Sequence, residues 1–214
     1  DGVYRNSEVW INGHYLGKRP YGYISFQYEL TPHLIYGSNK NVIAVKVDNS
    51  QQANSRWYSG TGIYRNVWLT TLDPVHVEHW GTYWTTPEVN TQSATVVIKT
   101  EVINSSLNKA QVNLTTIIQD SSGRVVARDT VKGVAPTNVF SLTEIVKDEK
   151  GKEVSRRTDR VSNEEVSQTL KVSSPSLWSD ERPYLYKIVS QLEQGGRIVD
   201  RYETPLGIRT FRFD

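Results

Sequence analysis

The sequence predicts an all-β protein made of two antiparallel β-sandwich domains. Many short segments alternate apolar and polar residues with a period of two, which places the apolar side chains on one face of a strand. Turn residues separate these segments at intervals of roughly 8–12 residues. We find no segment with the i, i+3, i+4, i+7 apolar spacing of an amphipathic helix. Together these observations favour packed sheets over a helical or mixed architecture.

The first block of the chain contains strand patterns and one clear hairpin signal. Residues 7–11 lead into Asn12-Gly13, a dipeptide that accepts positive φ at both central positions of a tight turn. Residues 41–48 alternate, with Ile43, Val45 and Val47 on one face. Aromatic and β-branched residues dominate two further runs. We predict strands at 7–11, 41–48 and 63–72, followed by a strand at 75–85 just beyond this block.

The sequence changes near Asp73-Pro74, since the turns after this point are more regular and more charged, and we place a domain boundary there. Pro74 cannot donate to a β-ladder, so we divide the chain into residues 1–73 and 74–214. The second block alternates regularly, and we expect Val96, Ile98, Leu114 and Ile118 in its core. Its predicted strands are 94–102, 111–119, 124–131, 139–146, 153–156, 166–172, 186–192 and 198–202.

The composition excludes several classes of function. The chain has 25 basic and 23 acidic residues, so it lacks the excess of positive charge that favours binding to nucleic acid or an anionic membrane. No apolar run approaches the ~20 residues of a transmembrane helix. Cysteine is absent, which excludes disulfides and thiolate metal sites. Methionine is absent too, and the chain opens in the middle of a pattern, so we expect a piece of a longer protein.

Several short patterns match catalytic or cofactor sites only in part. His76 and His79 are three residues apart in a predicted strand, which sends their rings to opposite faces, whereas the zinc pattern H-E-x-x-H needs a helix. Gly60-Thr61-Gly62 lacks the third glycine and the helix of a dinucleotide-binding loop. Ser59 lacks the preceding glycine of a nucleophile elbow, because Trp57 stands there.

Neighbouring carboxylates do not form a catalytic pair in this sequence. Asp148 and Glu149, like Glu164 and Glu165, lie in polar, turn-like segments, whereas a general acid needs a desolvated pocket. We predict no catalytic residue, no metal ligand and no cofactor in this chain.

The richest segment for binding is the long polar and aromatic loop within residues 48–65. Long loops inside compact domains are usually functional or disordered, and its aromatic residues argue against disorder. Carboxylates and amides can bond vicinal hydroxyls of a sugar, while an aromatic ring covers its C–H face. The other interpretation is that Arg56, Trp57 and Tyr58 pack the loop onto the sandwich. Composition alone leaves both open.

The loop contains the string RWYSGTGIYR at 56–65. This string resembles glycoside hydrolase family 2, which contains β-galactosidases, β-glucuronidases and β-mannosidases, and it is most similar to the β-galactosidase branch. The resemblance extends over nearly the whole chain. The other segments that show the resemblance are SEVWINGHYLG at 7–17, YGY at 21–23, NVIAVKVDN at 41–49, LWS at 177–179, PYLY at 183–186 and GIRT at 207–210.

The resemblance implies a multidomain retaining β-glycosidase. Residues 1–73 would be the later part of its sugar-binding jelly-roll domain, and residues 74–214 its immunoglobulin-like domain. In the family two glutamates of a following (β/α)₈ barrel perform catalysis. We expect that barrel to begin near Asp214, so the chain alone is predicted to be inactive.

The resemblance also implies where the chain touches substrate. In the β-galactosidases an Asp in the loop after the corresponding strand bonds galactose hydroxyls at the barrel mouth. The matching position here is Asp48, with Asn49 beside it, and Arg56 and Trp57 are secondary candidates. The alternative for all four is a role in packing the loop.

Two classes of function follow from these observations. The first is a part of a β-galactosidase, with the missing barrel and a β-galactoside or related glycan as partners. The second is a stand-alone carbohydrate-binding or adhesion module. If the opening strands of the first block are missing, an uncovered sheet edge should favour self-association. By resemblance only, a periplasmic or extracellular location is favoured over the cytoplasm.

Overall fold

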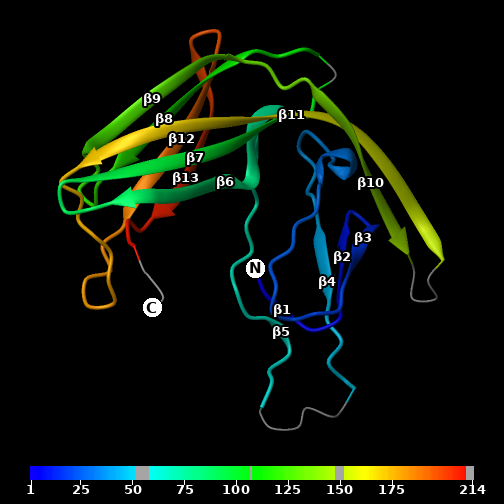
Figure 1. The fold of residues 1–214 in the computed structure, drawn as a ribbon. Helices are drawn as coiled ribbons and strands as arrows, with labels where there is room; N and C mark the ends of the chain where they lie inside the picture. Colours follow the sequence, from blue (N-terminus) through cyan, green and yellow to red (C-terminus); the bar gives the residue numbers. More distant parts are fainter. Residues whose placement is uncertain (52–57, 107, 148–151, 211–214) are drawn as a thin grey trace. The chain divides into compact units, whose positions relative to one another are not determined.

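The computed structural model describes residues 1–51, 58–106, 108–147 and 152–210 (Figure 1). The chain divides into two compact units. Unit 1 comprises Asp1–Thr70 and Thr143–Arg157, and unit 2 comprises Thr71–Leu142 and Thr158–Asp214. The first unit ends at Thr70, close to the predicted boundary at Pro74, and residues 143–157 also group with it. The two domains predicted from the sequence, 1–73 and 74–214, stay a prediction. Among the described residues no helix is long and apolar enough to cross a membrane.

Unit 1 contains two small antiparallel sheets. Strands β3, β2 and β4 form one sheet in that order, and β1 pairs with β5 in the other. A short 3₁₀ helix, η1, lies between β3 and β4. The elements are β1 (Val3–Tyr4), β2 (Ser7–Ile11), β3 (His14–Arg19), η1 (Thr31–His33), β4 (Ile43–Lys46) and β5 (Gly62–Ile63).

The β2–β3 hairpin confirms the predicted Asn12-Gly13 turn. Asn12 and Gly13 have φ values of 49° and 84°, as a two-residue turn with positive φ at both positions requires. The Asn12 side chain also joins three segments. Its Nδ2 donates to His33 O and Asn41 Oδ1, both at 2.8 Å, and its Oδ1 accepts from Val42 N at 2.9 Å. This residue therefore fixes β4 beside the hairpin.

The core of unit 1 is small. Val9, Ile11 and Leu16 are buried, and they pack with half-buried residues that include Phe26 and Val45. Of the three residues predicted on one face of this strand, Val45 and Val47 are half-buried and Ile43 is 48% exposed. The structure does not support a strand over residues 63–72, because only Gly62–Ile63 pairs there. The aromatic and branched residues of that run remain on the surface, with Val67, Trp68 and Leu69 at 70%, 71% and 77% exposure.

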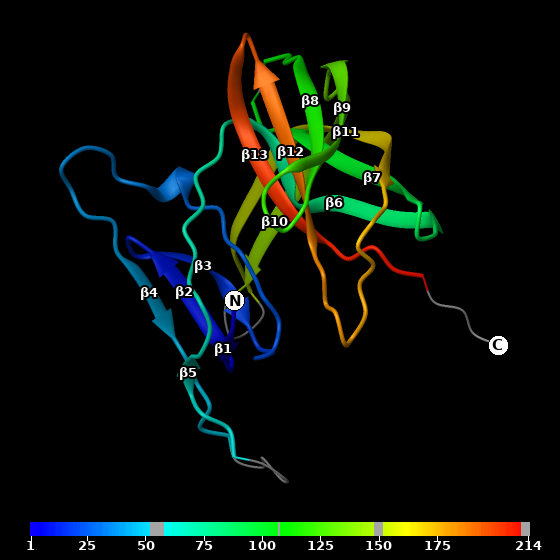
Figure 2. The same ribbon diagram turned by 90° about the vertical axis from the view of Figure 1, so that its left-hand side faces the viewer.

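Unit 2 contains a β-sandwich of two four-stranded sheets, apart from residues 143–147 of β10 and 153–157 of β11, which group with unit 1. The strand orders are β10-β11-β7-β6 and β13-β12-β8-β9, and Figure 2 shows the second sheet against β6 and β7 of the first. The strands are β6 (Val75–Val89), β7 (Ser93–Asn104), β8 (Val112–Gln119), β9 (Val125–Val134), β10 (Asn138–Lys147), β11 (Glu153–Ser173), β12 (Tyr186–Gln194) and β13 (Arg197–Leu206).

The core of unit 2 confirms the predicted inward faces. Val96, Ile98, Leu114 and Ile118 are all completely buried. They come from β7 in one sheet and β8 in the other, so the two sheets close around a shared interior. The hairpin turn at Gly195-Gly196 is also confirmed, with φ values of 58° and 80°.

One strand prediction in unit 2 was wrong. The predicted strands 153–156 and 166–172 form a single strand, β11, which runs from Glu153 to Ser173. The intervening residues are polar, so the sequence suggested a loop. The backbone nevertheless pairs without interruption from Ser162 to Ser173 along β7, where a polar side chain on the outer face costs little.

Candidate functional site

The best-placed candidate residues lie where the chain leaves β4. Asp48 N donates to Arg5 O at 3.2 Å, and Asn6 Nδ2 donates to Asp48 O at 3.0 Å. Arg5 and Asn6 form the turn between β1 and β2. The backbone of Asp48 is therefore held against that turn, and the start of the long loop has a defined position within unit 1.

The Asp48 carboxylate is exposed and partly engaged. Its Oδ1 accepts hydrogen bonds from Ser50 N at 2.9 Å and from Ser50 Oγ at 2.6 Å, which is an Asx turn. The bond from the Ser50 hydroxyl, followed by the backbone bond, lowers the pKa of Asp48. Within the described part of the chain, Oδ2 has no hydrogen bond. The carboxylate thus caps the loop and keeps one charged oxygen for another partner.

Asn49 and Arg5 extend the polar surface beside Asp48. Asn49 Nδ2 donates to Thr61 Oγ1 at 3.2 Å, and Arg5 donates through a terminal guanidinium nitrogen to Gln51 O at 3.1 Å. Asn49 Oδ1 and Arg5 Nε are buried, and among the described residues neither has a hydrogen-bond partner. The Asn49–Thr61 bond joins the two ends of the loop, and the Arg5–Gln51 bond holds its start against the segment between β1 and β2. Arg56 and Trp57, the other two candidates, lie outside the described residues.

An aromatic group next to Arg5 was not predicted as part of the site. The rings of Tyr4 and Tyr23 are 5.3 Å apart, and those of Tyr21 and Tyr23 are 5.6 Å apart. Tyr21 and Tyr23 are 58% and 62% exposed. Gly22 is required between them, since a Cβ there would lie 2.3 Å from the Tyr4 ring. The sequence signal that could have identified this group is Tyr21-Gly22-Tyr23, in which two aromatic residues flank a glycine.

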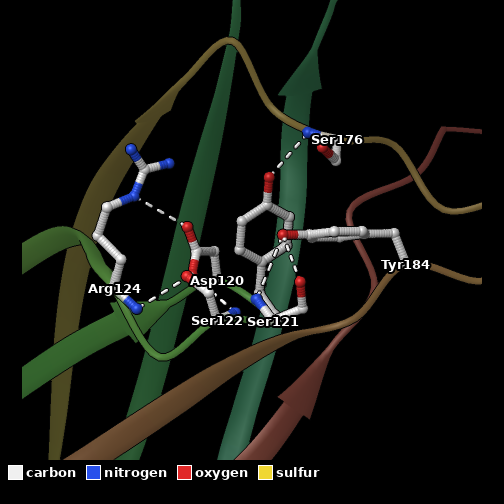
Figure 3. Close-up of polar contacts among 7 residues, drawn as sticks. Asp120, Ser121, Ser122, Arg124, Ser176 and Tyr184 are labelled. Carbon is white, nitrogen blue, oxygen red and sulfur yellow. Dashed lines mark hydrogen bonds and ion pairs between the residues drawn. The ribbon is translucent and has the colours of Figure 1, made fainter.

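A hollow lies in unit 2, at the turn between β8 and β9. It has a volume of about 560 Å³, and its lining comes from residues 119–123, 185–187 and 203–205. Figure 3 shows how the turn is built. Tyr184 Oη accepts hydrogen bonds from Ser121 N at 3.2 Å and Ser121 Oγ at 3.0 Å. This bond anchors the turn to the segment that precedes β12.

The acidic residues at this hollow are committed to structural contacts. Asp120 accepts bonds from Ser122 and Arg124, and these lower the pKa of Asp120 to about 2, with the Ser122 hydroxyl as the largest cause (Figure 3). Glu203 pairs with Lys187 at 2.6 Å and also with Arg201, and the Lys187 bond lowers its pKa. A general acid needs the opposite shift, so the hollow is not arranged for acid catalysis.

The histidines and adjacent acids that match catalytic or metal-binding patterns only in part make ordinary structural contacts. His76 Nδ1 lies 2.9 Å from Asp73 O, and the His79 ring lies 4.4 Å from the Trp80 ring. Of the adjacent acids, Glu164 accepts from a backbone N–H and Glu165 pairs with Lys99 at 2.8 Å. Asp148 and Glu149 lie outside the described residues. No cluster of three metal-ligating side chains occurs in the described ranges.

Comparison with known proteins gives a consistent result over the whole chain. A family model for glycosyl hydrolases family 2 matches residues 131–209. The chain is 46% identical to a β-galactosidase of Bacteroides ovatus over 100% of its length, and 37% identical to a putative β-glucuronidase of Formosa agariphila over 98%. It spans only 22% and 17% of those two proteins.

A solved structure supports the same assignment. The crystal structure of a glycosyl hydrolase family 2 member from Bacteroides cellulosilyticus matches with a TM-score of 0.81 and 32% identity. The match covers 100% of this chain and 24% of that one. Sequence and fold agree over both units, and the chain belongs to glycosyl hydrolase family 2.

Proposed function

We propose that the chain forms the sugar-binding and immunoglobulin-like part of a retaining β-galactosidase. In this proposal it supplies accessory substrate contacts and packs against a catalytic barrel that the chain itself does not contain. The observation that carries the proposal is the 46% identity to a β-galactosidase over the whole chain. A putative β-glucuronidase and a β-glucuronidase from Formosa agariphila are less similar to the chain, at 37% and 34% identity. The higher identity to the β-galactosidase makes a galactoside the favoured substrate.

The geometry after β4 supports a role in substrate contact. Asp48 presents a charged, exposed oxygen, and its pKa is lowered, so it remains a carboxylate in any neutral or mildly acidic solution. A carboxylate can accept two hydrogen bonds from neighbouring sugar hydroxyls. Asn49 and the Tyr21–Tyr23 group add amide and aromatic surface of the kind that sugars contact.

The substrate class is tested with the intact parent enzyme. We expect kcat/KM for an aryl β-galactoside to exceed that for the matching aryl β-glucuronide by about tenfold or more, because a site built for a neutral hydroxymethyl group leaves the glucuronide carboxylate unpaired. Steady-state kinetics on both substrates give the ratio. A ratio in favour of the glucuronide would identify the enzyme as a β-glucuronidase, which the Formosa agariphila relatives make the second candidate.

We also propose that the isolated chain self-associates through unit 1. Val67, Trp68 and Leu69 are more than two-thirds exposed in a run without strand pairing, and exposed apolar runs favour association. Light scattering over a concentration series should show mass above that of the monomer. Replacing Val67 and Leu69 by serine should reduce the association, whereas serine at exposed Val125 of unit 2 should not. A monomer at every concentration would refute the proposal.

A further inference from the structure

A layer of polar side chains divides the core of unit 2. Each of four neighbouring strands places one polar residue at the middle of its inward face, and all four residues are at most 3% exposed. They are Thr100 in β7, Thr116 in β8, Gln168 in β11 and Ser190 in β12. We call these four residues the polar layer.

The polar layer separates two apolar clusters. In β7, Thr100 lies between Ile98 of one cluster and Val102 of the other. The same arrangement holds in the other three strands, where the flanking pairs are Ile118 and Leu114, Leu170 and Val166, and Ile188 and Leu192. Buried polar groups at the centre of a sandwich cost free energy unless they are hydrogen-bonded, so each member of the layer needs a partner.

Half of the polar layer is satisfied by direct contacts between the two sheets. Thr116 Oγ1 donates to Gln168 Oε1 at 2.6 Å across the sandwich. Gln168 Nε2 in turn donates to Asp129 Oδ2 at 3.0 Å, and Asp129 is exposed. This chain of bonds links β8, β11 and β9 and ends at the solvent.

The other half of the layer has hydroxyl groups without hydrogen-bond partners among the described residues. Thr100 Oγ1 and Ser190 Oγ are buried, and no described residue hydrogen-bonds to either of them. The same holds for Thr82 Oγ1, which lies on β6 directly opposite Thr100 in the strand register. Ser190 is directly opposite Thr116 in the other sheet. Thr82 and Thr100 thus form one pair of hydroxyls in the first sheet, in the row of Val166, and Ser190 lies in the second sheet beside Thr116. Each of these hydroxyls can donate and accept.

We infer that the polar layer is an internal hydration site, in which buried water is held between the hydroxyls of Thr82 and Thr100 and, in the other sheet, at the hydroxyl of Ser190. A buried water in a protein typically makes two to four hydrogen bonds to groups that would otherwise lack partners. Thr82 and Thr100 are cross-strand neighbours, close enough for one water to bond to both. Water is the ligand because the three groups are neutral and small, which offers an ion no compensating charge.

A crystal structure of this chain at about 1.5 Å resolution tests the inference directly. We expect ordered solvent within about 2.6–3.2 Å of Thr100 Oγ1 or Ser190 Oγ. A dry layer, with the hydroxyls turned to backbone carbonyls and other buried waters visible elsewhere, would overturn it.

Two variants at Thr100 give an independent test. Thr100→Val replaces the hydroxyl by a methyl group of equal shape, so it should remove the ordered water and lower the melting temperature by a few degrees. Thr100→Ser keeps the hydroxyl and should keep the water. If Thr100 has no partner at all, Thr100→Val should instead raise the melting temperature, which counts against the inference. Should Thr100→Val fail to fold, Ser190→Ala replaces it with the same readouts.

Discussion

The isolated chain is expected to leave a chromogenic β-galactoside unhydrolysed, with turnover at least about a millionfold below that of the parent enzyme. Retaining glycosidases need two carboxyl groups about 5–5.5 Å apart, one of them an acid with a raised pKa. Among the described residues, the carboxylic acids with shifted pKa values are Asp48, Asp120 and Glu203, and all three shift downward. Glu8, which is 7% exposed, is held by Lys18 and Lys46 at 3.7 and 3.8 Å.

The measurement needs chain purified free of host β-galactosidase, assayed beside the parent enzyme at equal molar concentration. A rate that rises with chain concentration and survives repurification would contradict the prediction. Calorimetric titration of the same sample with a galacto-oligosaccharide serves as a companion experiment. Tight binding without turnover would favour the stand-alone carbohydrate-binding module over the enzyme part.

Replacing Asp48 by alanine in the parent enzyme is expected to lower kcat/KM for the β-galactoside by roughly ten- to a hundredfold. The reason is the loss of a carboxylate whose Oδ2 has no partner among the described residues and can bond sugar hydroxyls. The alanine variant also loses the Asx turn to Ser50, so its melting temperature should fall as well.

Asp48→Asn separates the two roles of the carboxylate. The amide oxygen of asparagine can still accept from Ser50, so the loop cap and the melting temperature should be retained while kcat/KM falls. Ser50→Ala is the matched control, because it removes one bond to Asp48 but leaves the carboxylate in place. Wild-type kinetics in Asp48→Asn, with lowered stability in Asp48→Ala, would show that Asp48 only caps the loop.

Much of unit 2 could be predicted because its signals are local. Alternation in β7 and β8 placed Ile98 and Leu114 inward, and both are fully buried. The prediction of two separate strands within Glu153–Ser173 was wrong because residues 157–165 are mostly polar in the sequence and show no strand pattern. Pairing with β7 keeps the backbone extended from Ser162 onward, and pairing between distant segments is not visible in the local pattern.

Unit 1 was less predictable for a related reason. Residues 63–72 have strand-like composition, yet only Gly62–Ile63 finds a partner, in β1. Strand propensity reports a fit to a half-buried sheet surface, and without a neighbouring strand it produces none. The position of Asp48 after an alternating strand was visible in the sequence. Its bond to Ser50 was not, since an Asx turn depends on the path of the loop.

The polar layer has a further consequence for how the sandwich selects one strand alignment. Because side chains alternate with a period of two, a slip of β11 by two residues along β7 would keep every apolar residue facing inward. Hydrophobic burial alone would barely distinguish that arrangement from the native one. The slip would, however, move Gln168 away from Thr116 and break the hydrogen bond that joins the two sheets, at a cost of about 1–3 kcal/mol for each group left without a partner. The Thr116–Gln168 hydrogen bond therefore favours the native strand alignment over one that is shifted by two residues.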